Sequence, residues 1–212
     1  MNAGLANLAT LRAFLLPVAL QAGTDDDVAL LEIGLGVAGA MERYCGRRFP
    51  RAVAVADIFG ADRCQFVLAR FPVEAVTKIE RKLNEAEGYL EQSLVDAVQS
   101  IDLGNGIVYF PDNADAGPYY AQMRFTYTGG YFFNVKEPAD NGYPTAQPSG
   151  STALPDDLRL AWLLQCGEVW NKMDKLGTSI AEKPDASNLT SALTLAPLVK
   201  QTLDGYRRLN FA

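Results

Sequence analysis

The chain has 212 residues, of which 49% are hydrophobic and 21% charged, a balance typical of globular proteins that bury an apolar core. Its net charge of -6 argues against a general nucleic-acid binder, which needs a basic face. The absence of histidine excludes histidine-dependent catalytic triads and histidine metal ligands. The widely spaced cysteines Cys45, Cys64 and Cys166 indicate neither a zinc site nor a disulfide framework. No apolar run reaches the roughly 18 residues of a membrane span, so we expect no membrane partner.

The first two predicted helices cover residues 5–16 and 24–45. The second begins with a capping-box-like pattern at Thr24, and Gly46 is suited to end it. We interpret Asp25-Asp26-Asp27 as a complement to the helix dipole, because three adjacent helical residues point apart and make a poor metal cage. Apolar residues at steps of three and four predict one buried stripe. It consists of Val28, Leu31, Leu35, Ala38, Met41 and Cys45.

The same stretch also fits a dinucleotide-binding turn, because Gly34, Gly36 and Gly39 form a literal G-x-G-x-x-G. Asp57 follows at about the distance of a ribose-binding acid, so the alternative is an NAD(P)-binding enzyme. We favour the helix, since Glu32 would otherwise lie in a strand that is buried on both faces. Each helical glycine costs about 1 kcal/mol relative to alanine, so close approach of another helix is then expected.

After Phe49 the periodicity changes, and residues 52–132 are predicted to be rich in strands. We expect two hairpins, the second around the turn Gly104-Asn105-Gly106, and two further strands. The hairpins pair Ala52–Phe59 with Cys64–Phe71 and Leu94–Ile101 with Ile107–Phe110, and the other strands are Val73–Leu83 and Met123–Tyr127. Residues 133–153 are rich in proline, glycine and polar residues and are predicted to form a long loop.

The next predicted helix covers residues 155–176, with Pro155 and two acids in its first turn. Its predicted buried stripe is Leu160, Leu163, Leu164, Gly167, Trp170 and Met173. Residues 178–212 form a C-terminal extension with a short helix near Pro197. The sequence thus predicts an α+β fold, a helical bundle of N-terminal and C-terminal helices with a strand-rich middle of antiparallel hairpins. Residues 1–177 are assigned to one domain.

Several segments, taken in order, resemble the head–tail connector (adaptor) proteins of long-tailed bacteriophages and related gene-transfer-agent particles. The resemblance covers most of residues 5–176, and the order and spacing of the segments make it specific. The segments are Asp27–Leu31, Glu42–Phe49, Arg70–Val76, Phe125–Tyr131 and Leu154–Ala161. The glycine cluster at Gly34 departs from the alanine-rich helix usual in such proteins.

The resemblance implies a structural virion protein of the neck, made in the host bacterial cytoplasm, rather than an enzyme. Such adaptors form a homo-oligomeric ring, typically of twelve copies, that joins the portal to the stopper or tail-completion protein. The ring encloses the channel through which DNA leaves during genome ejection, without binding it specifically. It implies no catalytic residues, cofactor or metal. A further interaction module of another class remains an alternative.

The last predicted helix ends in a basic, aromatic segment that we expect to dock on the portal. Its candidate residues are Tyr206, Arg207, Arg208 and Phe211. Arginine and large aromatic residues are the types that most often anchor protein interfaces. Because the core is expected upstream, truncation after Leu195 is predicted to leave a folded protein.

Overall fold

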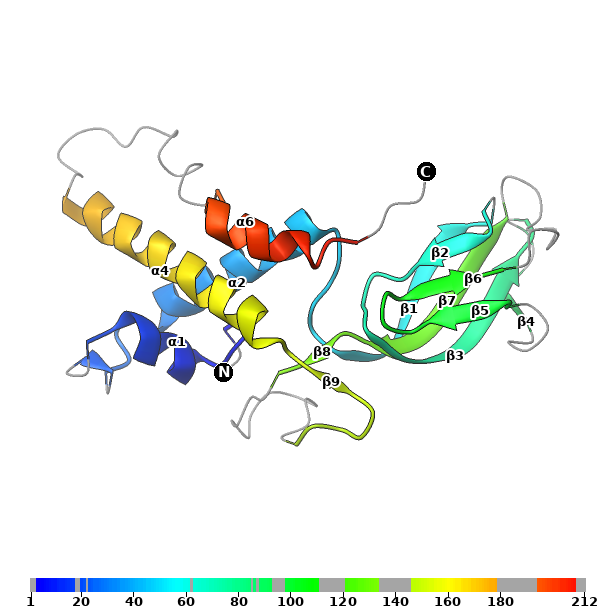
Figure 1. Cartoon of the computed structure of the whole chain (residues 1–212), viewed down its shortest axis with the longest axis horizontal. Helices are drawn as coiled ribbons and strands as arrows, with labels where there is room; N and C mark the ends of the chain where they lie inside the picture. The colour runs from blue at the N-terminus through cyan, green and yellow to red at the C-terminus, as the bar shows by residue number, and fades with distance from the viewer. Residues whose placement is uncertain are drawn as a thin grey trace. The chain divides into compact units, whose positions relative to one another are not determined.

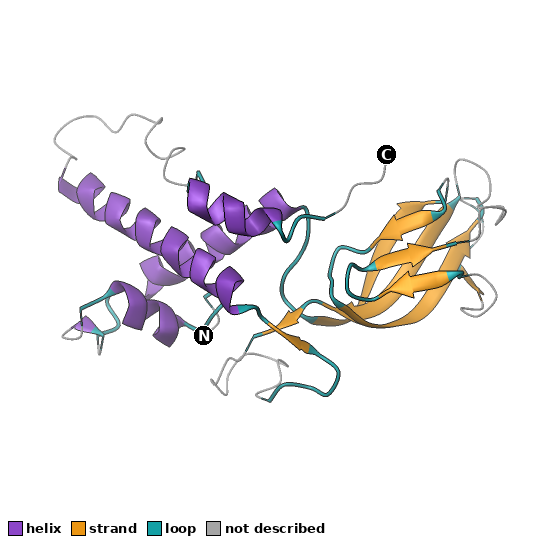
Figure 2. Cartoon of the chain, viewed as in Figure 1, coloured by secondary structure: helices purple, strands orange, loops and turns teal. Residues whose placement is uncertain are grey.

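The computed structural model describes residues 3–17, 20–21, 23–61, 63–84, 86, 88–92, 98–110, 121–133, 146–178 and 194–208. The chain divides into two compact units, one helical and one built from antiparallel strands (Figures 1 and 2). The helical unit comprises Met1–Gly46, Phe133–Pro148 and Ala153–Arg207, and the β unit comprises Arg47–Phe132, Ser149–Thr152 and Arg208–Ala212. The α+β class predicted from the sequence is confirmed. The predicted boundary at residue 177, between one domain and a C-terminal extension, stays a prediction.

The helical unit is organised around two long helices that pack on each other, α2 and α4, and the shorter α1 and α6 each contact both of them. The helices span Leu8–Leu15 (α1), Asp27–Cys45 (α2), Asp156–Thr178 (α4) and Pro197–Asp204 (α6). Each lies within three residues of its predicted start. Thr24 does not cap α2, because Asp26 is its N-cap residue and no side chain caps it there. Gly46 ends α2 in the left-handed conformation at φ 64°, as predicted.

Gly34, Gly36 and Gly39 lie inside the continuous helix α2, which confirms the helical interpretation. Gly34 has a packing reason, because a Cβ added there would lie 2.1 Å from the carbonyl oxygen of Ala3. The indole Nε1–H of buried Trp162 on α4 donates to the Gly34 carbonyl oxygen over 2.9 Å. A close approach therefore exists at Gly34, made by the segment before α1 and by the Trp162 side chain of α4. At Gly36 an added Cβ meets nothing within 4 Å, and at Gly39 it meets only the Arg43 side chain of the same helix.

The predicted buried stripes of α2 and α4 are partly wrong. Val28 and Leu35 of α2 are 69% and 55% exposed, and Leu160 and Leu164 of α4 are 51% and 40% exposed. The helices bury neighbouring stripes instead. In α2 these are Leu30, Ile33, Gly34, Val37, Ala38, Met41 and Cys45, and in α4 Leu158, Ala161, Trp162, Leu163, Gln165, Cys166 and Val169. Both stripes of each helix are apolar, so the period alone could not select the inner one.

The β unit contains a four-stranded and a three-stranded antiparallel sheet. The first has the order β1 (Ala52–Gly60), β7 (Gln122–Gly129), β3 (Val73–Lys82), β4 (Leu90–Gln92). The second has the order β2 (Gln65–Val67), β6 (Ile107–Tyr109), β5 (Ser100–Asp102). A short pair, β8 (Tyr131–Phe132) and β9 (Thr152–Ala153), completes the described strands.

The first predicted hairpin is wrong, because β1 pairs with β7 and β2 pairs with β6. The second is confirmed, since β5 and β6 pair around the turn at Gly104. An aromatic cluster fills the core of the β unit, with ring centroids 5.0 to 6.2 Å apart. Its members are Phe59, Phe66, Phe110 and Phe125. Parts of the predicted second hairpin, of the loop and of the extension, namely residues 93–97, 134–145, 179–193 and 209–212, lie outside the described residues.

Candidate functional site

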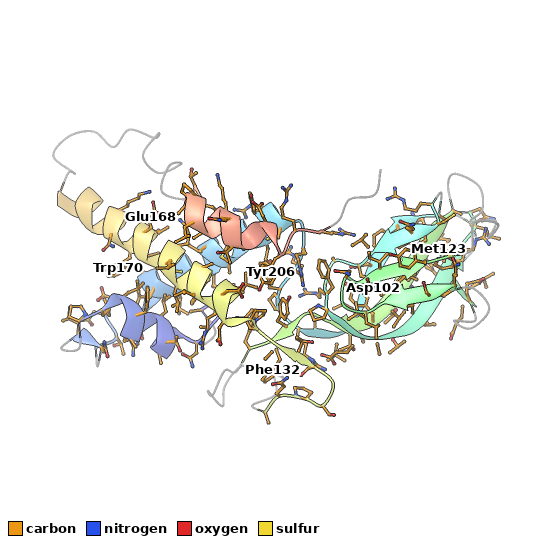
Figure 3. All side chains as sticks on the ribbon, viewed as in Figure 1. Asp102, Met123, Phe132, Glu168, Trp170 and Tyr206 are labelled. Atoms are coloured by element: carbon orange, nitrogen blue, oxygen red, sulfur yellow. The ribbon has the colours of Figure 1, made fainter. Side chains whose placement is uncertain are left out.

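The predicted docking segment follows α6, and its first residue is already engaged within the helical unit. The Tyr206 hydroxyl donates to Oδ1 of Asp157 over 2.6 Å, at the start of α4 (Figure 3). Asp157 also accepts a hydrogen bond from the backbone N–H of Leu158. Tyr206 therefore fastens the end of α6 to the first turn of α4, a structural contact that the sequence pattern did not indicate.

Arg207 presents the most exposed guanidinium of the described docking residues, with a side chain 59% exposed. Its Nη1 lies 3.9 Å from Oδ1 of Asp204, and its guanidinium carbon lies 5.5 Å from the centroid of the Tyr44 ring. Tyr44 in turn donates from its hydroxyl to Asp204 over 2.7 Å, and this hydrogen bond raises the pKa of the Tyr44 phenol. An exposed ion pair of this length contributes little to stability, so Arg207 is free to exchange Asp204 for another acidic partner.

Arg208 belongs to the β unit, where its Nη2 donates to the carbonyl oxygen of Val67. Its guanidinium carbon lies 5.9 Å from the centroid of the Phe59 ring. Burial lowers the pKa of Arg208, and the nearby Asp57 carboxylate opposes that shift. Half-buried contacts of this kind fix the backbone rather than offer a surface. Phe211, the fourth predicted docking residue, lies outside the described residues.

Asp57, the acid of the dinucleotide alternative, has a structural role in β1. Its Oδ2 accepts hydrogen bonds from the Tyr127 hydroxyl and from the backbone N–H of Ala69, both over 2.7 Å. Burial, with Asp57 beside it, raises the pKa of the Tyr127 phenol, which keeps the hydroxyl protonated as a donor. The Tyr127 oxygen also accepts from the backbone N–H of Arg70 over 3.0 Å.

The dinucleotide interpretation is wrong at the level of structure. It needs a strand over residues 28–33, a tight turn at Gly34 and a helix after it. These residues are instead helical throughout, and the strand that carries Asp57 pairs antiparallel with β7. No nucleotide site of this kind is therefore formed by Gly34, Gly36, Gly39 and Asp57.

Within the described part of the chain, no group of three or more cysteine, aspartate or glutamate side chains is placed to hold a metal ion. Asp27, from the acidic run that begins α2, instead forms an ion pair with Arg12 of α1. No described helix is long and apolar enough to cross a membrane.

The face of the four-stranded sheet that lies away from the aromatic core carries a charged network. Glu80 of β3 is almost fully buried and accepts from Nε of Arg124 on β7 over 2.7 Å, while Nζ of Lys78 lies 2.9 Å away. These hydrogen bonds, Arg124 first, lower the pKa of the Glu80 carboxyl to about 2. Arg124 also lies over the ring of Tyr89, 3.9 Å from its centroid. Alternation along the sequence places Lys78 and Glu80 on the same face of β3. That Arg124 is the partner of Glu80 on the neighbouring strand could be known only from the order of strands in the sheet.

Neither the protein-family models nor the curated proteins compared with the sequence match it. Solved structures do match it in fold. One matching chain belongs to the neck of an empty gene transfer agent (GTA) particle with C6 symmetry, and another to the virion of a native GTA particle. The identities are 17% and 15%, and both TM-scores are 0.55. Each match covers 98% of this chain and 92% of the other. The chain therefore shares the fold of these GTA chains along nearly its whole length, which agrees with the resemblance found in the sequence.

Proposed function

We propose that this chain is a non-enzymatic structural protein of the virion neck, a head–tail connector that forms a ring between the portal and the stopper or tail. The observation that supports this is the near-complete coverage of both chains in the fold match to GTA neck and virion structures. A match over both units, rather than one, is what a protein with the same architectural task would give. Twelve copies per ring are proposed, as the sequence resemblance implies.

The net charge of -6 supports a channel that DNA crosses without being held. A basic lumen would release counterions from the phosphates and bind the duplex tightly. The protein is made in the host bacterial cytoplasm and becomes part of the particle there.

The function is tested by deleting the gene that encodes the chain in a bacterium that produces the particles. Electron microscopy of the lysate is expected to show DNA-filled heads without tails, together with free tails. Supplying the wild-type chain from a plasmid should restore complete particles. Complete, tailed particles in its absence would rule out a connector role.

The segment after α6 is proposed to dock on an acidic, apolar surface of the portal, with Arg207 as the exposed cation and Phe211 as a further anchor. The prediction that the core lies upstream of α6 is wrong, because Val199 and Leu203 of α6 are buried in the helical unit. Truncation after Leu195 would therefore disturb the fold and cannot test docking. The test is therefore Arg207→Glu and, separately, truncation after Arg208, which removes Leu209–Ala212.

Both variants are expected to fold, and both should lose co-purification with the portal. Lys200→Glu, the same charge change on α6 itself, is the matched control and should retain it. If Arg207→Glu still completes particles at the wild-type rate, the docking surface lies elsewhere.

A further inference from the structure

Both long helices of the helical unit present an apolar face to the outside in addition to the face they bury. Val28 and Leu35 on α2 are more than half exposed, as is Leu160 on α4, and Leu164 is 40% exposed. A helix that is apolar on opposite sides is typical of a helix that is covered on both. Among the described residues, α1 covers part of the outer side of α4 at Gly167, and the large apolar side chains named above stay exposed.

The middle of the outer face of α2 carries two glycines, which have no side chains. Val28 and Leu35 lie two turns apart on it, and Gly36 follows with nothing within 4 Å of an added Cβ. At Gly39 the nearest group is Nη1 of Arg43, 3.6 Å from where a Cβ would be. Among the described residues, the backbone at these two glycines is thus open to close approach by large side chains from another molecule.

The outer face of α4 carries large side chains. Leu160 and Leu164 are one turn apart on it, and Gly167 comes a further turn on. Phe14 of α1 fills the space beside Gly167, with Cε1 3.6 Å from where a Cβ would lie, and it is 45% exposed. Together Phe14, Leu160 and Leu164 form an apolar ridge across α1 and α4.

α2 and α4 pack on each other (Figure 1), and each buries the stripe opposite its exposed apolar residues, so the two outer faces lie on opposite sides of this helix pair. Complementary surfaces on opposite sides of one unit associate front to back, and such a heterologous contact closes into a ring when the rotation allows. A single self-complementary face would instead give a two-fold dimer. The occupant that fits both faces is therefore a second copy of this chain.

The charges at one end of the two faces are complementary in an antiparallel arrangement. Along α2, Glu32 precedes Leu35 and Arg43 follows it, both on the outer side. Along α4, Asp156 precedes the ridge, with its side chain 91% exposed, and Lys172 follows it. Antiparallel packing that places Leu35 opposite Leu164 also places Arg43 opposite Asp156 of the other copy, because each charged residue lies eight positions from the leucine of its own helix.

We propose that the α2 face of one copy packs antiparallel on the α1–α4 ridge of the next, and that this contact builds the ring. The inference rests on the proposed function, since it assigns the surfaces through which the connector ring assembles. It needs no other partner and uses side chains that the described part of the chain leaves exposed.

The test is cross-linking with a short bismaleimide in chains that carry Cys64→Ser, because Cys45 and Cys166 are buried. Chains with Leu35→Cys are mixed with chains carrying Leu164→Cys under conditions in which the wild type forms rings by electron microscopy. Covalent dimers are expected only in the mixture. A chain with both substitutions should give a ladder that ends at the number of copies in the ring. Leu35→Cys mixed with Gln201→Cys, an exposed position on α6, is the control and should stay uncross-linked.

A charge exchange tests the same contact independently. Arg43→Glu should raise the protein concentration needed for ring formation by about tenfold or more, since like charges then meet at the interface. Adding Asp156→Arg should restore assembly. Each change opposes the dipole of its own helix, so rescue can come only from the contact between copies.

The outcomes separate the two proposals. Wild-type rings without cross-links in the Leu35→Cys and Leu164→Cys mixture would overturn the assigned surfaces and leave the connector function standing. Cross-links within a single variant would indicate a two-fold contact and overturn the assigned surfaces as well. A wild-type chain that stays monomeric alone and in the presence of purified heads would overturn both proposals.

Discussion

At the scale of single residues, the glycines of α2 show how one residue type serves two purposes in one helix. Gly34→Ala should lower the free energy of unfolding by about 1–3 kcal/mol, because the added methyl would overlap the Ala3 carbonyl oxygen and Trp162. Gly36→Ala should raise it by up to about 1 kcal/mol, since it removes a flexible residue from an exposed helical position. Urea unfolding of both variants, below the concentration at which the protein assembles, checks the opposite signs. A loss of similar size in both would mean that Gly36 is also packed.

The buried carboxylate Glu80 predicts a specific dependence of stability on pH. Its pKa is lowered from 4.5 to about 2 in the folded chain, so its contribution is present above pH 4.5 and is lost as the pH falls toward 2. Glu80→Gln should therefore be clearly less stable than the wild type at pH 7, with the difference shrinking between pH 4.5 and 2. Guanidinium unfolding across this range measures it.

Glu91→Gln is the matched control for Glu80. Glu91 is 66% exposed, and its Oε2 lies 3.6 Å from the same Lys78. An exposed pair of this kind contributes little, so the control should show almost no change with pH. A difference for Glu80→Gln that stays constant down to pH 2 would contradict the assigned ion pairs.

At the scale of elements, α6 belongs to the core of the helical unit, although residues 179–193 between α4 and α6 are not described. Ala196 donates from its backbone N–H to Oε1 of Gln165 on α4, and Leu203 is fully buried. Leu203→Ala should lower the free energy of unfolding by about 2–5 kcal/mol through cavity formation. Leu198→Ala on the same helix, where the side chain is 63% exposed, should change it by less than about 0.5 kcal/mol. Thermal unfolding of both variants distinguishes a core helix from a detachable extension.

At the scale of the whole molecule, the acidic charge predicts how the assembled protein treats DNA. With a net charge of -6 per chain, the rings should not retain duplex DNA in a filter-binding assay even at about 50 mM salt, where phosphate contacts are strongest. Retention that falls steeply as salt is added would reveal a basic lumen and contradict free passage of the DNA.

Local sequence determined which segments are regular and where several of them end. Gly46 adopts the left-handed conformation that stops α2, Pro155 precedes α4 directly, and the Gly104-Asn105-Gly106 turn joins the paired strands β5 and β6. These features depend on backbone preferences within a few residues, so they can be predicted from the sequence without knowing which other elements pack against them. The candidate docking residues followed from composition alone, and their contacts with Asp157, Asp204 and Val67 did not.

Tertiary structure alone decided the pairing of strands and the choice of buried faces. β1 is close to β2 in sequence yet pairs with β7, because sheet order depends on packing across many residues rather than on the intervening turn. Leu35 and Leu160 are as apolar as the residues beside them that are buried. Where a helix has two apolar stripes, the neighbouring helix that packs against it determines which stripe is buried.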